Sequence, residues 1–305
     1  MILAEIHNVI TRWGLSKFRK IVSLIVIFFL VIQLNPAKAA GLNLTEHFSA
    51  CLNTDNITRI NANGECLAIQ SFFNKNKLPN KNSKLLIFIH GDGAKGGGPS
   101  DYLKHQAQSI LDPDAISTVL IRPGYYDSYG NYSTGESYAF DCEGLPCDGY
   151  RKRTIATLAA GIKKLNDFYH PICTILIGHS GGAMMSGVIL GKYPNLVNGA
   201  VLASTTNNVQ EWTNRHGWKE WVHSFSPHDW VAKIPKNTFI YIVSGIKDEN
   251  TYPEMARAYY ELLKKFKIRA HFIAVQNGTH NSIVLDEAKD FRSAIQRALK
   301  DCPSS

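Results

Sequence analysis

A short apolar run that passes through a glycine-rich turn into a helical pattern constrains this chain more than any other feature. Residues 173–177 are Cys-Thr-Ile-Leu-Ile, the turn Gly178-His179-Ser180-Gly181-Gly182 follows at once, and 183–191 have a helical pattern. Glycines on either side of a serine let the backbone turn sharply without a steric clash, so the serine hydroxyl is exposed at the end of the strand. The segment predicts a strand–turn–helix unit with Ser180 as a candidate nucleophile.

Apolar runs and helical patterns alternate through the rest of the chain. We expect strands at 67–73, 84–89, 117–121, 173–177, 199–203, 238–243 and 270–275. We expect helices at 102–111, 151–168, 183–191, 252–266 and 284–299. Short apolar strands separated by helices indicate an α/β fold, in which helices cover both faces of a mostly parallel central sheet.

Two segments depart from this alternation. Residues 41–65 are polar and hold no expected strand, so the strand at 67–73 is expected at the edge of the sheet. Residues 204–237 are too long for a simple connection, and they contain Trp212, Trp218, Trp221 and Trp230. We expect small helices there, over the end of the sheet, with the tryptophans as packing residues rather than as parts of a substrate pocket.

The N-terminal residues have the three parts of a secretory signal peptide. A basic stretch (Arg12, Lys17, Arg19 and Lys20) precedes the apolar run 21–34, and Ala37-Lys38-Ala39 supplies a small-x-small cleavage site. The apolar run is short for a membrane span, which needs about 20 residues. We expect cleavage after Ala39, export to the periplasm or the medium without a stable membrane span, and a single domain over 40–305. An uncleaved N-terminal anchor is the alternative.

The net charge points to no nucleic-acid partner. The chain carries +8, and residues 1–39 contribute +4 of it through five basic side chains and one acid, which leaves +4 after cleavage. The remaining lysines and arginines form no stripe with interleaved aromatic residues, which nucleic-acid binding would favour.

All the cysteines follow the predicted cleavage site, and their even number in an exported chain indicates disulfides. They are Cys51, Cys66, Cys142, Cys147, Cys173 and Cys302. Nearness in sequence favours pairing within 51–66 and within 142–147, which leaves Cys173 with Cys302, although other pairings remain open. The spacing of Cys142 and Cys147, without a second cysteine or histidine pair, does not suit zinc. We expect no metal and no organic cofactor.

With its serine turn between a buried strand and a helix, the sequence resembles the α/β-hydrolase superfamily over roughly residues 65–300. The resemblance implies a serine nucleophile, followed along the chain by an acid and a histidine at the ends of later strands. Asp248 fits the acid, because it ends a Gly-x-x-Asp turn after the strand at 238–243; Glu249 and Asp229 remain alternatives. His280 follows the strand at 270–275 and is the expected general base.

The resemblance also implies an oxyanion hole made of backbone N–H groups. One donor is expected at Gly181, directly after the nucleophile. The other is expected at Asp92 or Gly93, in the loop that follows the strand at 84–89. Such donors stabilise the tetrahedral intermediate by about 3–4 kcal/mol each.

Four functions fit this pattern. The first is a serine hydrolase that cleaves carboxylic esters outside the cytoplasm by a Ser-His-Asp acyl-enzyme mechanism. The second is a peptidase or amidase with the same triad, because the pattern is also similar to the catalytic domain of prolyl-oligopeptidase-type peptidases. The absence of an upstream propeller domain favours esters.

The third is a non-catalytic binding protein of the same fold, and the fourth is a lipase, for which 204–237 is too polar to form a hydrophobic lid. The expected partner is a small-molecule or peptide acyl substrate; the sequence leaves its acyl and leaving groups, and the oligomeric state, open.

Overall fold

The computed structural model describes residues 54–73, 82–93, 101–110, 112–136, 149–285 and 288–303. All of them belong to the unit His47–Ser305, and the unit Met1–Glu46 lies wholly outside the described residues. The expected signal peptide, its cleavage and the domain limits therefore stay predictions. No helix in the described ranges is long and apolar enough to cross a bilayer.

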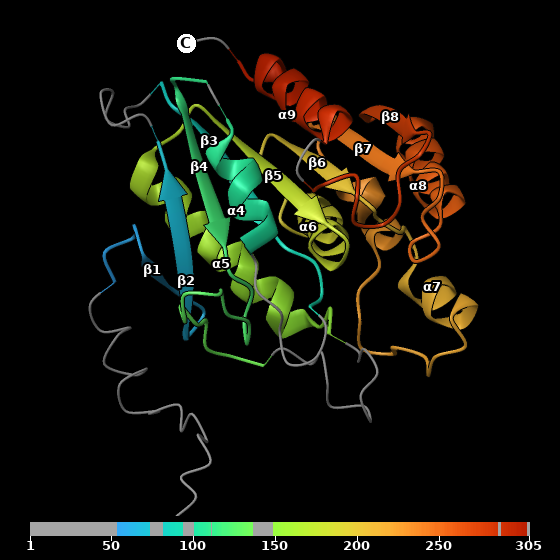
Figure 1. Ribbon diagram of the computed structural model, residues 1–305, viewed down its shortest axis with the longest axis horizontal. Coiled ribbons are helices and arrows are strands. Elements are labelled where there is room, and N and C mark those ends of the chain that lie inside the picture. The colour runs from blue at the N-terminus through green and yellow to red at the C-terminus, as the bar shows by residue number, and fades with distance from the viewer. Residues whose placement is uncertain are drawn as a thin grey trace, which may run out of the picture. The chain divides into compact units, whose positions relative to one another are not determined.

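The described residues form an eight-stranded sheet in the order β1-β2-β4-β3-β5-β6-β7-β8 (Figure 1). Its strands are β1 Arg59–Ala62, β2 Glu65–Phe72, β3 Lys84–Ile89, β4 Ala115–Leu120, β5 Cys173–His179, β6 Gly199–Ala203, β7 Phe239–Gly245 and β8 Arg269–Val275. Every pair from β4 to β8 is parallel, whereas β2 is antiparallel to both β1 and β4. The predicted α/β class with a mostly parallel sheet is confirmed.

Helices cover both faces of the sheet, as predicted. They are α4 Asp101–Gln108, α5 Lys152–Tyr169, α6 Gly181–Lys192, α7 Val209–Arg215, the 3-10 helix η1 Pro227–Lys233, α8 Pro253–Lys265 and α9 Lys289–Asp301. Successive strand residues point to opposite faces, so each parallel strand supplies two cores. Leu85, Ile87 and Ile89 of β3 pack in the core with α5, α6 and α8. Leu86 and Phe88 pack in the core with α4 and α9.

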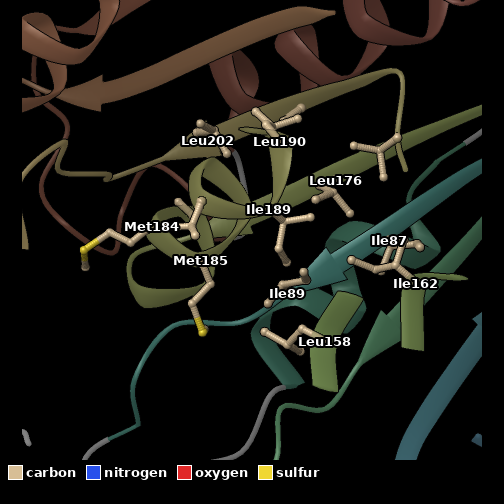
Figure 2. Close-up of a cluster of buried hydrophobic side chains, with 14 of the residues drawn as sticks. Ile87, Ile89, Leu158, Ile162, Leu176, Met184, Met185, Ile189, Leu190 and Leu202 are labelled. Carbon is tan, nitrogen blue, oxygen red and sulfur yellow. The ribbon is translucent and has the colours of Figure 1, made fainter. Parts of the chain in front are cut away.

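The core next to α6 positions the serine turn. Figure 2 shows side chains of α5 and α6 gathered around residues of β3, β5 and β6. The residues labelled there are Ile87, Ile89, Leu158, Ile162, Leu176, Met184, Met185, Ile189, Leu190 and Leu202. Because α6 has buried residues over nearly its whole length, its start is held firmly against the sheet.

One strand was missed from the sequence, and the position of its neighbour was wrong. β1 lies at the edge of the sheet and β2 lies inside it, although the strand at 67–73 was expected at the edge. β1 and β2 form a hairpin through Asn63 and Gly64, both of which have positive φ (54° and 82°). An Asn-Gly pair favours a two-residue hairpin turn, because both residues tolerate positive φ. That pair is the sequence signal that identifies β1.

A disulfide ties a central strand to the C-terminal helix. Cys173, the first residue of β5, is bonded to Cys302, just after α9, and their Cα atoms lie 5.7 Å apart. This pairing is the one left by elimination from the sequence, and it is confirmed. Cys66 is also disulfide-bonded. Its expected partner Cys51, and the expected pair Cys142–Cys147, lie outside the described residues.

Candidate active site

The backbone at Ser180 has a strained conformation. Ser180 stands between β5 and α6 with φ 52° and ψ −123°. Non-glycine residues rarely adopt such a conformation, and they keep it only where the surrounding structure holds them. Packing of β5 and α6 on both sides holds Ser180 in place. Its side chain lines a cleft of about 520 Å³.

Two glycines of the turn are required by close approaches of the backbone. A Cβ atom on Gly178 would lie 2.6 Å from the Cα of Ala183, and one on Gly182 would lie 2.1 Å from the carbonyl oxygen of Ile89. Both distances are shorter than any real Cβ contact. The small residues therefore let α6 start directly above β5 and beside the end of β3.

The three residues predicted as a triad come together beside this turn. The Nε2 atom of His280 lies 3.0 Å from the Oγ of Ser180. The Nδ1 atom of His280 lies 3.1 and 3.2 Å from the two carboxylate oxygens of Asp248. Asp248 follows β7 and His280 follows β8, so neighbouring parallel strands bring both residues to the same edge of the sheet as Ser180.

Asp248 is held as a charged carboxylate. Burial raises its pKa, but the hydrogen bonds from His280 and Thr251 outweigh this effect and keep the pKa below the usual range. The carboxylate also accepts the backbone N–H groups of Asn250 and Thr251, both at 2.9 Å. An ionised carboxylate on Nδ1 favours the tautomer in which Nε2 is free to accept the Ser180 proton.

The two alternative acids do not contact His280 in the described structure. Glu249 is exposed next to Asp248. Asp229 lies in η1 and pairs with His228 at 3.1 Å. Of the three candidates, Asp248 is the one that the fold brings to the imidazole.

The predicted oxyanion-hole residues also lie beside the cleft or directly after Ser180. Asp92 and Gly93 follow β3 and line the cleft together with Ser180. Gly181 is the first residue of α6, and the first N–H groups of a helix have no partner within the helix. Gly181 lies next to Asp92, because a Cβ atom on it would be 2.7 Å from the Asp92 Oδ2.

The carboxylate of Asp92 is compensated by a buried cluster that sequence reasoning missed. Arg122, whose side chain is 2% exposed, pairs with it at 2.8 Å. The hydroxyls of Tyr125 and Tyr150 donate to the same carboxylate. Burial raises the pKa of Asp92, but the charge of Arg122 and these hydrogen bonds lower it by more than burial raises it. The pKa of Asp92 therefore lies below its usual value. The loop that carries the expected oxyanion donor is thus fixed by an ion pair.

A chain of hydrogen bonds links that loop to the backbone of His280. The Gly91 N–H donates to the Tyr102 hydroxyl at 2.7 Å, and the hydroxyl lies 2.9 Å from the Nδ1 of His179. The Nε2 of His179 lies 3.0 Å from the carbonyl oxygen of His280, which also accepts from Ser204. A carbonyl only accepts, so His179 carries its proton on Nε2 and accepts from Tyr102 on Nδ1.

His90 is likewise neutral. Its Nε2 accepts the backbone N–H of Arg122 at 3.0 Å, so its Nδ1–H donates to the Gly91 carbonyl at 2.8 Å. Burial lowers the pKa of His90 to about 3, and the charge of Arg122 lowers it in the same direction. Burial also lowers the pKa of His179 to about 3, with a further contribution from His280.

These two histidines predict a loss of stability in mild acid. As the pH falls from about 6.5 toward 3, the unfolded chain takes up protons that the folded chain does not, so the free energy of unfolding decreases. The expected loss between pH 7 and pH 5 is about 3–4 kcal/mol for both histidines together. Urea unfolding at several pH values measures it. His179→Gln should remove about half of the pH dependence of the unfolding free energy, and His105→Gln, at an exposed position, is the control. An unchanged unfolding free energy between pH 7 and pH 5 would contradict the prediction.

The cleft is lined by residues that the sequence did not identify as parts of a site. They include Tyr102, His179, Trp212, Trp218, Asn250, Asn281, Val284 and Leu285. The expectation that the tryptophans of 204–237 only pack was wrong for Trp212 and Trp218. α7 brings Trp212 to the rim of the sheet, where the indole both packs and faces the cleft. The helix expected from 284 starts at Lys289, so Val284 and Leu285 lie in the preceding turn.

Within the described ranges, no group of three or more His, Cys, Asp or Glu side chains could hold a metal ion.

Comparison with known proteins gives matches in structure and none in sequence. No family model matches the chain, and no curated protein matches it. The acylaminoacyl peptidase of Pyrococcus horikoshii superposes with a TM-score of 0.60 at 12% identity, over 79% of this chain and 40% of that one. The Pyrococcus furiosus esterase Pf2001 superposes with a TM-score of 0.60 at 15% identity, over 80% of this chain and 89% of that one.

A third solved structure, Est1E from Butyrivibrio proteoclasticus with ferulic acid bound, has a TM-score of 0.59 and 14% identity, over 80% of this chain and 98% of that one. The chain thus spans less than half of the peptidase but most of the other two proteins. At these identities the likeness shows a shared fold.

Proposed function

Because this chain has the α/β-hydrolase fold, we propose that it is a serine hydrolase that cleaves carboxylic esters with Ser180, His280 and Asp248 as its triad. The observation that carries the proposal is the continuous hydrogen-bonded series from the Ser180 hydroxyl through His280 to the Asp248 carboxylate. A series of this kind, at the mouth of a cleft, supplies an activated nucleophile.

The reaction follows from the positions of these groups. His280 Nε2 takes the proton of Ser180 while the Ser180 oxygen attacks the ester carbonyl carbon, and the imidazolium is stabilised by Asp248. The tetrahedral intermediate collapses when the alcohol leaves with the proton from His280. Water then attacks the acyl-enzyme by the same steps, releasing the acid and restoring Ser180.

Backbone N–H groups hold the negative oxygen of each intermediate. Gly181 supplies one, and Asp92 or Gly93 supplies the other. The Asp92 carboxylate is paired with Arg122 at 2.8 Å, so its charge is balanced beside the developing oxyanion. Each donor is worth about 3–4 kcal/mol in the transition state.

The comparisons support esters over peptides. The esterase Pf2001 and Est1E are matched over 89% and 98% of their lengths, whereas the acylaminoacyl peptidase is matched over 40%. Peptide or amide hydrolysis with the same triad is the second candidate, and the structural match to the peptidase is what favours it. Export from the cytoplasm remains part of the proposal.

Labelling with a fluorophosphonate, followed by mass mapping, tests the proposed function. An adduct on Ser180 that is absent in His280→Ala is the expected result, because the probe reacts with an activated serine. Rates on a short acyl ester and on an aminoacyl amide then separate the two candidates. Folded protein that gives no adduct and hydrolyses neither substrate would favour a non-catalytic binding protein.

Tyr102→Phe is expected to reduce kcat by about tenfold while KM changes less than twofold. The substitution removes the hydroxyl that joins the Gly91 N–H to His179, and leaving buried groups unpaired costs about 1–3 kcal/mol. The oxyanion loop and the His280 backbone then lose their common support. Steady-state kinetics measure the effect, with the more exposed Tyr126→Phe as control. A raised KM at unchanged kcat would show that Tyr102 binds substrate and does not position the loop.

A further inference from the structure

Two indole rings, those of Trp212 and Trp218, line the cleft, and the ring of His216 packs against Trp218. We call Trp212, His216 and Trp218 the aromatic wall; Trp212 and Trp218 line the cleft beside Ser180 and His280. The rings of His216 and Trp218 are stacked, with centroids 4.4 Å apart and planes at 16°. The Trp212 ring meets Trp218 edge to face at 5.1 Å. Trp212 and Trp218 thus bring aromatic side chains to the cleft that the proposed nucleophile also lines.

The aromatic wall is fixed to the loop that carries Asp248. The indole N–H of Trp212 donates to the Asn250 carbonyl at 2.8 Å, and the Nε2 of His216 lies 2.8 Å from the same oxygen. The Asn250 N–H in turn donates to the Asp248 carboxylate at 2.9 Å. Trp212 is buried and packs against Trp221 as well. A wall held in this way binds a ligand without first being ordered, which favours affinity.

The other apolar groups of the cleft come from the turn before α9. Val284 is buried and Leu285 is 42% exposed. Among the described lining residues, the one carboxylate is that of Asp92, which is paired with Arg122. His179 is held neutral by its hydrogen bonds. Lys247 and Glu249 line an adjoining hollow of about 480 Å³, which shares Trp218, Asn250, His280 and Asn281 with the cleft. Among the described residues that line the cleft itself, no side chain offers an unpaired charge to a charged substrate group.

The size of the cleft fits a small organic substrate. Ligand pockets typically have volumes of about 300–1,000 Å³ with mostly apolar walls and a few polar groups. The cleft, at about 520 Å³, falls in that range, and its polar groups include Asn250 and Asn281. Aromatic rings gain affinity from edge-to-face and offset contacts beyond what burial of the same area gives, by about two- to tenfold. A saturated ring of equal size lacks this gain.

We propose that the aromatic wall is the subsite for an uncharged aromatic ring, so that the substrates are esters in which the acid or the alcohol carries such a ring. The inference rests on the proposed ester hydrolysis at Ser180. According to the inference, Trp212 and Trp218 select the class of substrate, although they take no part in the acyl-transfer steps.

Matched pairs of esters test the inference in the full-length protein. Methyl phenylacetate is compared with methyl cyclohexylacetate for a ring on the acid, and benzyl acetate with cyclohexylmethyl acetate for a ring on the alcohol. The aryl ester is expected to have a kcat/KM about three- to tenfold higher in at least one pair. Equal values in both pairs, or a higher rate on the acetate of a quaternary ammonium alcohol, would overturn the inference.

Two substitutions at one position attribute the preference to the aromatic wall. Trp218→Leu keeps an apolar side chain but removes the aromatic face, so the aryl preference is expected to fall to about one. Trp218→Phe restores a flat ring and is expected to retain most of the preference. Trp230→Phe is the control, because Trp230 packs near Phe225 and Lys192 and does not line the cleft. An aryl preference that survives Trp218→Leu unchanged would also contradict the inference.

A binding measurement separates this inference from the proposed function. Benzyl alcohol and cyclohexylmethanol are titrated into the wild-type protein, and tryptophan fluorescence reports occupancy. Tighter binding of benzyl alcohol that is lost in Trp218→Leu supports the subsite even if no ester is hydrolysed. Hydrolysis of esters with equal binding of the two alcohols and no aryl preference leaves the proposed function intact and overturns the subsite.

Discussion

Ser180→Ala and His280→Ala are each expected to lower kcat for ester hydrolysis by about 10⁴- to 10⁶-fold while the protein stays folded. In the proposed mechanism, Ser180 provides the bond-forming oxygen, and His280 takes its proton across 3.0 Å. Neither step proceeds at a useful rate when either group is missing. The residual rate comes from substrate binding and from the backbone N–H groups that hold the oxyanion.

The combination of the two substitutions provides a sharper measurement than either alone. When two groups act as a unit, the effects of removing them do not add. The kcat of Ser180→Ala/His280→Ala should therefore lie within about threefold of the kcat of the slower single variant. Ser186→Ala is a matched control, because Ser186 lies on α6, which begins directly after Ser180, and its hydroxyl donates to the Gly182 carbonyl. The triad assignment fails if either single variant keeps full activity, or if Ser186→Ala is as inactive as Ser180→Ala.

Arg122→Met is expected to lower the free energy of unfolding by about 3–5 kcal/mol. The substitution leaves the Asp92 carboxylate in a largely buried position without its cation, and it also removes the bond from Arg122 to the His90 carbonyl. Removing one partner of a buried ion pair costs much more than removing both, because the remaining charge is left unpaired. Asp92→Asn added to Arg122→Met should therefore recover part of the loss.

Urea unfolding measures the coupling between the two residues in a double-mutant cycle. It gives the free energy of unfolding of the wild type, the two single variants and the double variant. The expected coupling between Arg122 and Asp92 exceeds about 1 kcal/mol, because the two side chains are in direct contact. Lys163, which pairs with Asp167 at the exposed surface of α5, offers a control pair whose coupling should be at most about 0.5 kcal/mol. Additive effects of Arg122→Met and Asp92→Asn would mean that the ion pair does not support the loop.

Local sequence patterns accounted for most of the elements. β3 and β6 span the residues expected for them, 84–89 and 199–203, because a continuous apolar run between polar residues has few alternatives to a buried strand. The strand–turn–helix at Ser180 was equally local, since only small residues fit where α6 starts against β5 and β3. β1 was missed because it is short and half polar, although the Asn63-Gly64 pair marks its turn.

The candidate site was predicted in part, because its members follow strand ends but their contacts span long sequence distances. The sequence proposed Asp248 with Glu249 and Asp229 as alternatives, and only the register of β7 beside β8 decides which carboxylate reaches His280. Tyr102 and His179 had no sequence signal for their hydrogen bond, since 77 positions separate them. Trp212 and Trp218 looked like packing residues, because an indole near a core and an indole on a cleft have the same local pattern.

By itself, the sequence determined the class of fold and the position of the candidate nucleophile, and it favoured the pairing of Cys173 with Cys302 among the pairings left open. The fold class and the serine turn depend on apolar periodicity and on steric limits, which act between residues near in sequence. The cysteine pairing depends on how few cysteines the chain has. The tertiary structure alone decided the acid partner of His280, the buried pair of Arg122 with Asp92 and the aromatic wall. Those contacts arise when the ends of parallel strands meet at one edge of a sheet, and no local pattern encodes which side chains face each other there.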